Sequence, residues 1–192
     1  MKQKLEKALS ARDKVCIDDC SLTSAAILIP VFHHDGEYRL LFTKRTEHLR
    51  AHKGQISFPG GTWEDSDESL LYTALRECTE EIGLSPGVVE VLGELDDTPT
   101  MHTNFCIRPF VGVIPWPLEL TKDPFEVAEI LTFPVSGLLE NDVLRHEDDP
   151  ANDGTAEGDF YYCNDRIIWG ATARILTQFL EIWSALDGDD RR

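Results

Sequence analysis

The sequence has few cysteines, little positive charge and no long apolar run. Its five cysteines include no C-x-x-C pair, which excludes a zinc knuckle and argues against a disulfide framework. The longest apolar stretch, Ala25 to Phe32, is far shorter than the roughly 18 residues that a membrane-spanning helix needs. The first ten residues, MKQKLEKALS, lack the apolar segment of a secretory signal peptide. We therefore expect a cytoplasmic protein without a membrane partner.

Basic residues are scarce relative to acidic ones. Eighteen Lys and Arg stand against 35 Asp and Glu, which gives a net charge of −17. Such a field repels polyanions, so we expect no nucleic-acid partner and no binding to anionic lipid. If the substrate is itself an anion, cations or a few local basic groups must supply the positive charge.

Length and composition predict one globular domain over residues 1–192. The chain is 42% hydrophobic with 13 Gly and 10 Pro, values that exclude collagen-like, coiled-coil and largely disordered proteins. The sequence contains no internal repeat and no low-complexity linker that would mark a domain boundary. We expect residues 1–20 to form a leading helix or arm and the core to extend over about 25–186.

Strand and helix patterns alternate along the chain, which predicts an α/β fold. The apolar runs 25–32 and 38–44 flank an Asp-Gly turn and predict a β-hairpin. The polar segment 140–159 predicts a solvated loop, and it misses the EF-hand spacing because Ala151 stands where a ligand is required. Further strands are expected over 55–58, 88–95, 106–115, 128–134, 159–163 and 166–169, with helices over 67–82 and 171–186.

The helix predicted over 67–82 carries three carboxylates on one face. Glu77, Glu80 and Glu81 fall within an arc of about 100° on a helical wheel, beside the apolar stripe. That position predicts the margin of a cleft. Gly83 stands where a helix C-cap belongs, so the three acids also face the negative end of the helix dipole.

This arrangement is electrostatically unfavourable. Like charges at these spacings cost about 0.2–0.5 kcal/mol per pair, and acids near a helix C-terminus cost about 0.3–1 kcal/mol each. By contrast, the acids at 64, 65, 67 and 68 suit a helix N-terminus, where Asp67 or Ser66 can act as the cap. A divalent cation among the three later carboxylates would remove the repulsion, and oxygen ligands favour Mg²⁺ or Mn²⁺. The alternative is an ordinary solvated acidic face.

The segment Glu68 to Leu84 resembles the box of the Nudix hydrolases, G-x5-E-x7-R-E-U-x-E-E-x-G-U, where U is aliphatic. This chain departs from the box twice. Six residues separate Gly61 from Glu68, so either Glu68 or Asp67 is the first acid of the box, and Cys78 occupies an aliphatic position.

Residues 40–61, LLFTKRTEHLRAHKGQISFPGG, resemble a second signature, that of the coenzyme A pyrophosphatase branch of this family. The matching positions are Thr43, Arg45, Arg50, Gly54, Phe58, Pro59, Gly60 and Gly61. This resemblance implies cleavage of the diphosphate of coenzyme A or its derivatives, giving 4′-phosphopantetheine and adenosine 3′,5′-bisphosphate.

The resemblance also implies a fold and a set of site residues. The fold would be an α/β/α sandwich with a mixed curved sheet between helices. Glu77, Glu80 and Glu81 would hold Mg²⁺ or Mn²⁺ with the Gly60 carbonyl, and Arg76 would brace the carboxylates. The base that orients the attacking water would be Glu77 or Glu126. Two successive glycines, Gly60 and Gly61, would let backbone groups approach the metal and the phosphates of the substrate.

Four basic residues upstream of the glycines are candidates for binding the phosphates of a nucleotide substrate of the coenzyme A type. They are Arg45, Arg50, His52 and Lys53. The alternative is that they are surface charges, with His52 stabilising a turn.

Two other functions remain open. One is a Nudix pyrophosphatase of another nucleotide, such as ADP-ribose, NADH or an oxidised nucleoside triphosphate. The other is a non-catalytic Nudix module that senses a nucleotide, which the retained carboxylates disfavour. Residues 169–172, W-G-A-T, match the C-terminal pattern of the branch, and packing of the last helix explains them without a role in catalysis.

Overall fold

A computed structural model describes residues 1–19, 21–48, 52–100, 103–148 and 157–189. Its main sheet has eight strands, of which five form the order β3-β2-β1-β7-β5, while β4 pairs with β1, β6 with β7 and β8 with β2. The β1–β7 pair is parallel and the other pairs are antiparallel, so the sheet is mixed. The strands are β1 (Thr23–His34), β2 (Glu37–Arg45), β3 (Ile56–Ser57), β4 (Gly60–Thr62), β5 (Glu90–Glu94), β6 (Thr98–Pro99), β7 (Phe105–Val113) and β8 (Val127–Pro134).

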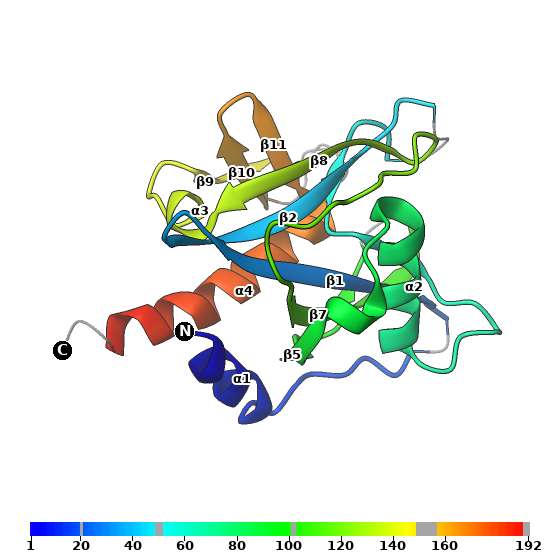
Figure 1. The fold of residues 1–192 in the computed structure, drawn as a ribbon, viewed down its shortest axis with the longest axis horizontal. Coiled ribbons are helices and arrows are strands. Elements are labelled where there is room, and N and C mark those ends of the chain that lie inside the picture. The colour runs from blue at the N-terminus through cyan, green and yellow to red at the C-terminus, as the bar shows by residue number, and fades with distance from the viewer. Residues whose placement is uncertain (20, 49–51, 101–102, 149–156, 190–192) are drawn as a thin grey trace.

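Helices cover both faces of this sheet (Figure 1). Helix α2 (Leu70–Ile82) packs on one face, and α1 (Lys2–Ser10) and α4 (Gly170–Asp189) pack on the other. Each face of the sheet has its own hydrophobic cluster, because side chains along β1 point alternately to the two faces. Leu28 and Phe32 pack in the cluster with α2, while Ile29 and Val31 pack in the cluster with α1 and α4. The predicted α/β/α sandwich is confirmed.

The predicted hairpin is formed by β1 and β2. Its register pairs Val31 with Leu40 and His34 with Glu37. The two turn residues, Asp35 and Gly36, have φ values of 50° and 85°, which are typical of the tight turns that match strand twist. The hairpin sets the position of the C-terminal half of β2, which ends at Arg45.

A second, three-stranded sheet corrects the prediction of a loop over 140–159. Its order is β11-β10-β9, with β9 (Leu144–Asp148), β10 (Glu157–Cys163) and β11 (Arg166–Trp169). The polar sequence of β9 is compatible with a strand because cross-strand contacts hold it. The Arg145 guanidinium lies 4.4 Å from the ring centre of Tyr162, whose hydroxyl donates to Glu147 at 2.7 Å. Ala151 lies outside the described residues.

The leading segment belongs to the core, whereas the sequence predicted a core beginning near residue 25. Leu5 and Leu9 of α1 are buried against α4 and β5. A Cβ on Gly93 would lie 2.8 Å from the Cβ of Leu9, so the helix contacts the strand backbone closely. Two short elements, η1 (Pro86–Val88) and α3 (Val135–Leu138), complete the fold. Within the described part of the chain, no helix is long and apolar enough to span a membrane.

Helix α2 ends at Gly83 as predicted, in the left-handed conformation with φ 68°. A Cβ at this position would lie 3.2 Å from the backbone N and O of Thr121. We expect Gly83→Ala to lower the free energy of unfolding by about 1 kcal/mol or more, since alanine is strained at this φ. Urea denaturation measures the change.

Gly87 provides the matched control. A Cβ there would meet nothing closer than Ser85 Oγ at 3.9 Å. Gly87→Ala should change the free energy of unfolding by less than about 0.5 kcal/mol. Equal losses in the two variants would contradict the assigned role of the left-handed cap.

Candidate active site

Helix α2 begins three residues later than the sequence predicts. Ser69 is its N-cap, and the Ser69 hydroxyl accepts a hydrogen bond from the Tyr72 backbone N at 3.1 Å. The prediction that Asp67 or Ser66 caps the helix was therefore wrong. Asp67 has another partner, and that partner organises the acidic residues of α2.

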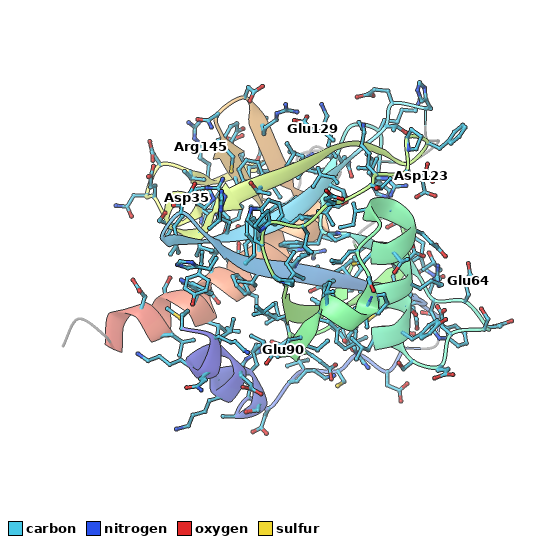
Figure 2. The ribbon with its side chains drawn as sticks, in the orientation of Figure 1. Asp35, Glu64, Glu90, Asp123, Glu129 and Arg145 are labelled. Carbon is cyan, nitrogen blue, oxygen red and sulfur yellow. The ribbon has the colours of Figure 1, made fainter. Side chains whose placement is uncertain are left out.

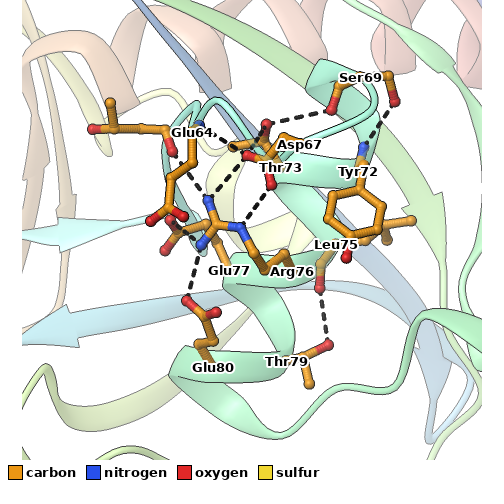
Figure 3. Close-up of polar contacts among 11 residues, drawn as sticks. Glu64, Asp67, Ser69, Tyr72, Thr73, Leu75, Arg76, Glu77, Thr79 and Glu80 are labelled. Atoms are coloured by element: carbon orange, nitrogen blue, oxygen red, sulfur yellow. Dashed lines mark hydrogen bonds and ion pairs between the residues drawn. The ribbon is translucent and has the colours of Figure 1, made fainter.

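Arg76 lies at the centre of the carboxylates (Figure 3). Its Nε and Nη2 donate to the two carboxylate oxygens of Asp67 at 3.0 and 3.2 Å. Its Nη1 lies 2.9 Å from Glu77 Oε1 and 2.9 Å from Glu80 Oε2, and its Nη2 also donates to the Thr62 carbonyl at 3.1 Å. The guanidinium thus joins three acids to the end of β4, in the bracing geometry that the sequence predicted.

Asp67 is the acid that fixes Arg76. Its carboxylate also accepts hydrogen bonds from the Thr73 hydroxyl at 2.8 Å and from the Glu64 backbone N at 3.0 Å. The hydrogen bonds from Arg76 hold the pKa of Asp67 down at about 2. Glu68, the other candidate for the first acid of the box, is exposed to solvent. The geometry therefore favours Asp67 for that position.

Glu81 is a buried carboxylate, with 3% of the residue exposed. Burial raises its pKa to about 8, with further increases from the charges of Glu77 and Glu126. The Arg45 guanidinium, whose Nη1 lies 3.8 Å from Glu81 Oε1, and the Gly60 backbone oppose this shift. Among the residues that the structure describes, Glu81 Oε2 has no hydrogen-bond partner. Such an oxygen is costly to bury and is suited to a cation.

Gly61 makes room for the carboxylate of Glu77. A Cβ on Gly61 would lie 2.5 Å from Cδ of Glu77, and a Cβ on Gly60 would lie 2.3 Å from the Ala26 carbonyl oxygen. Both glycines are thus needed for close contacts within the protein, and the predicted approach of a metal and phosphates to their backbone stays a prediction. Burial raises the pKa of Glu77, and the neighbouring Arg76 opposes this shift.

The three predicted metal ligands occupy different environments. The side chain of Glu80 is 59% exposed and that of Glu81 is 4% exposed. Within the described residues, no three His, Cys, Asp or Glu side chains converge as a ready-made metal site. The donor set is nevertheless all oxygen and includes the unpartnered Glu81 Oε2, so these residues fit a hard divalent cation. Their role as metal ligands stays a prediction.

A cleft of about 990 Å³ adjoins this group. Six of the residues predicted to bind metal or substrate or to act in catalysis line it, namely Arg45, His52, Gly60, Gly61, Glu77 and Glu126.

Of the four predicted phosphate-binding residues, Arg45 and His52 line the cleft. His52 Nδ1 lies 2.8 Å from Gln55 Oε1, which is the turn contact that the alternative interpretation expected. Lys53 is exposed and does not line the cleft. Arg50 lies outside the described residues.

Further acidic residues lie around this site. Glu64 also lines the cleft and lies beside α2, while Asp123 lies near the far end of that helix (Figure 2). Arg45 also lines the cleft, and its Nη1 lies 3.8 Å from Oε1 of the buried Glu81. A diphosphate entering here would meet carboxylates, so bound cations are needed to make its binding favourable.

A second group of cleft-lining residues could not be placed there from the sequence. It consists of Asp159 on β10, Trp169 on β11, the first turn of α4 and Phe105 on β7. In the sequence, packing alone explains residues 169–172, because nothing local indicates that the end of β11 lines the same cleft as the glycines of β4.

Comparisons with known proteins identify the family. The model of the NUDIX domain matches residues 22–152. An uncharacterized Nudix hydrolase NudL from Photorhabdus laumondii is 35% identical over 157 residues, covering 82% of this chain and 83% of the relative.

Two solved structures share the fold. They are a MutT protein from Methanosarcina mazei (TM-score 0.52, 16% identity, 95% of this chain and 100% of that chain) and a MutT/nudix family protein from Enterococcus faecalis (TM-score 0.54, 15% identity, 84% and 62%). At these identities they support the fold alone. The family model and the relative show that the chain belongs to the Nudix hydrolase family.

Proposed function

We propose that this Nudix pyrophosphohydrolase cleaves the diphosphate of coenzyme A or its derivatives, giving 4′-phosphopantetheine and adenosine 3′,5′-bisphosphate. The observation that carries the proposal is the cleft of about 990 Å³ that has Glu77 and Glu126 among its lining residues and an aromatic wall of Phe105 and Trp169. This volume is at the upper end for small-molecule sites, which suits a ligand with a nucleotide and a long arm.

The second signature supports the same substrate class, because four of its residues, Arg45, Phe58, Gly60 and Gly61, line this cleft. Arg45 ends β2 and lines the cleft, while its Nε is buried without a partner among the described residues. Phe58 stacks on Phe42 with ring centres 4.4 Å apart and lines the cleft beside the glycines. The signature therefore fixes a basic group and an apolar surface at the same opening.

Mg²⁺ or Mn²⁺ would be held by Glu77, Glu80, Glu81 and the Gly60 carbonyl. When bound, the ion neutralises the diphosphate and lowers the pKa of water in its coordination shell. Arg76 keeps Glu77 and Glu80 in place through charge-assisted hydrogen bonds.

Glu77 and Glu126 are the two candidates for orienting the attacking water. Both line the cleft, and their charges interact. Glu77 contacts Arg76. The backbone of Glu126 is fixed by a hydrogen bond from the Thr46 backbone N to the Glu126 carbonyl at 2.9 Å. The Arg45 guanidinium donates to oxygens of the bound anion.

The direct test is product analysis by mass spectrometry after incubation of coenzyme A with the protein and Mg²⁺. We expect 4′-phosphopantetheine and adenosine 3′,5′-bisphosphate, and a loss of at least about 100-fold in rate for Glu77→Gln or Glu81→Gln. Glu119→Gln, an exposed acid, is the control and should keep full activity. Turnover of ADP-ribose, NADH or oxidised nucleoside triphosphates in preference to coenzyme A would refute the substrate, and binding without turnover would indicate a sensor.

The identity of the first acid of the box is tested by a pair of variants. Asp67→Asn should reduce turnover by roughly 10- to 100-fold, because Arg76 then loses the charge that orients it toward Glu77 and Glu80. Glu68→Gln removes an exposed carboxylate and should leave turnover unchanged. Initial rates at saturating Mg²⁺ measure both, and the reverse order of effects would assign the position to Glu68.

Stability should depend on pH through Glu81. Its pKa is raised from 4.5 to about 8 on folding, so the folded state binds more protons than the unfolded state between these values. Stability of the metal-free protein should therefore fall as pH rises through this window. Thermal melts at pH 6 and pH 8 should show this fall, reduced in Glu81→Gln. Mg²⁺ should raise the melting temperature more at pH 8, since it binds the ionised form. An unchanged pH slope in the variant would contradict this assignment.

A further inference from the structure

One part of the cleft lining takes no part in the metal and carboxylate chemistry proposed above. It is formed by the end of β10, by Trp169 and by the first turn of α4, all of which follow the matched NUDIX segment 22–152. Figure 1 shows the β10–β11 hairpin leading directly into α4. Trp169 is the last residue of β11, and its side chain is partly buried and lines the cleft.

We propose that Trp169 is a specificity-determining residue that stacks on the adenine base of the substrate. This inference rests on the proposed function and assigns the nucleoside half of coenzyme A to the wall formed by β11 and α4.

The indole of Trp169 is held in a fixed orientation before any ligand binds. Phe160 is its direct cross-strand partner in the antiparallel β10–β11 pair. The two rings are nearly parallel, at 8°, with centres 6.4 Å apart. Because Phe160 is itself buried, the indole has a firm support. A pre-oriented ring loses little conformational freedom when a ligand stacks on it.

Space is available next to this ring. Gly170 follows Trp169 with φ 68°. Apart from its two chain neighbours and the adjacent helix backbone, no heavy atom of the described residues lies within 4 Å of the position that a Cβ would occupy. Residues Ala171 and Thr172, in the first turn of α4, continue the lining of the cleft. The junction between strand and helix therefore leaves an open volume beside an aromatic surface.

The chemical groups of coenzyme A indicate which of them binds beside Trp169. Coenzyme A has a diphosphate, a flexible pantetheine arm and a purine base, and the base is the part with a flat π-face. The diphosphate belongs at Glu77, Glu81 and Arg45, where cations and a guanidinium can bind it. Aromatic side chains bind bases by stacking, so Trp169 fits the purine.

The test uses the two reaction products as separate probes in isothermal titration calorimetry with Mg²⁺. Trp169→Leu keeps apolar bulk without the π-face, and Trp169→Phe restores an aromatic ring. We expect Trp169→Leu to weaken the binding of adenosine 3′,5′-bisphosphate by about 5- to 100-fold. Trp169→Phe should bind this product with an affinity within a few-fold of the parent protein. The affinity for 4′-phosphopantetheine should be unchanged in both variants.

Ile167 supplies the matched control. It lies two residues earlier on β11, is 43% exposed and does not line the cleft. Ile167→Ala should leave both affinities unchanged. Unchanged binding of adenosine 3′,5′-bisphosphate by Trp169→Leu, an equal loss for both probes, or no binding of that probe by the parent protein would overturn the proposal. A loss confined to 4′-phosphopantetheine would assign Trp169 to the arm instead and overturn it equally.

The outcomes separate this inference from the proposed function. If coenzyme A is cleaved but Trp169→Leu leaves the affinity for adenosine 3′,5′-bisphosphate and the KM for coenzyme A unchanged, the inference alone fails. If coenzyme A is not cleaved but the bisphosphate binds in a Trp169-dependent way, the proposed function fails and the assignment of the base stands.

Discussion

Mutual repulsion among the acids on α2 is the constraint on which the site depends. Ionised Glu77, Glu80 and Glu81 near the C-terminus of one helix repel each other and destabilise it, and positive charge among them offsets this cost. Arg76 supplies one such charge on the same helix, and its guanidinium is in turn fixed by Asp67. Arg45 supplies another from β2, opposite the buried Glu81. These contacts also join α2 to the sheet, because Arg45 on β2 lies beside Glu81 and Arg76 donates to the Thr62 carbonyl on β4.

The features that depend on local chain chemistry could be predicted from the sequence. The hairpin at Asp35 and Gly36, the helix ending at Gly83 and the buried strand over 25–32 all follow from spacing, apolar runs and turn residues that lie close together. The cluster of three glutamates on one helix was found for the same reason.

What the sequence did not predict depends on contacts between distant segments. Asp67 was predicted to cap the helix because acidic residues are common and favourable at helix N-termini. Its hydrogen bonds with Arg76 depend on the turn before α2, which brings residues nine positions apart into contact. The polar strand β9 looked like a loop because its stability comes from pairing with β10. Trp169 reaches the cleft through the second sheet, which no local pattern indicates.

The strand β1 has two different partners on one edge and a single partner on the other. Ala25 to Ile27 pair with β4, and Val31 to His34 pair with β2, while β7 runs along nearly the whole opposite edge. The backbone of the two glycines is therefore anchored in the main sheet and shares its rigidity. The cleft residues that follow residue 152 belong to a separate hairpin and one helix, so we expect substitutions there to change the shape of the opening more than the positions of the acids. A fold built in this way can exchange one ligand for another while the hydrolytic apparatus stays constant.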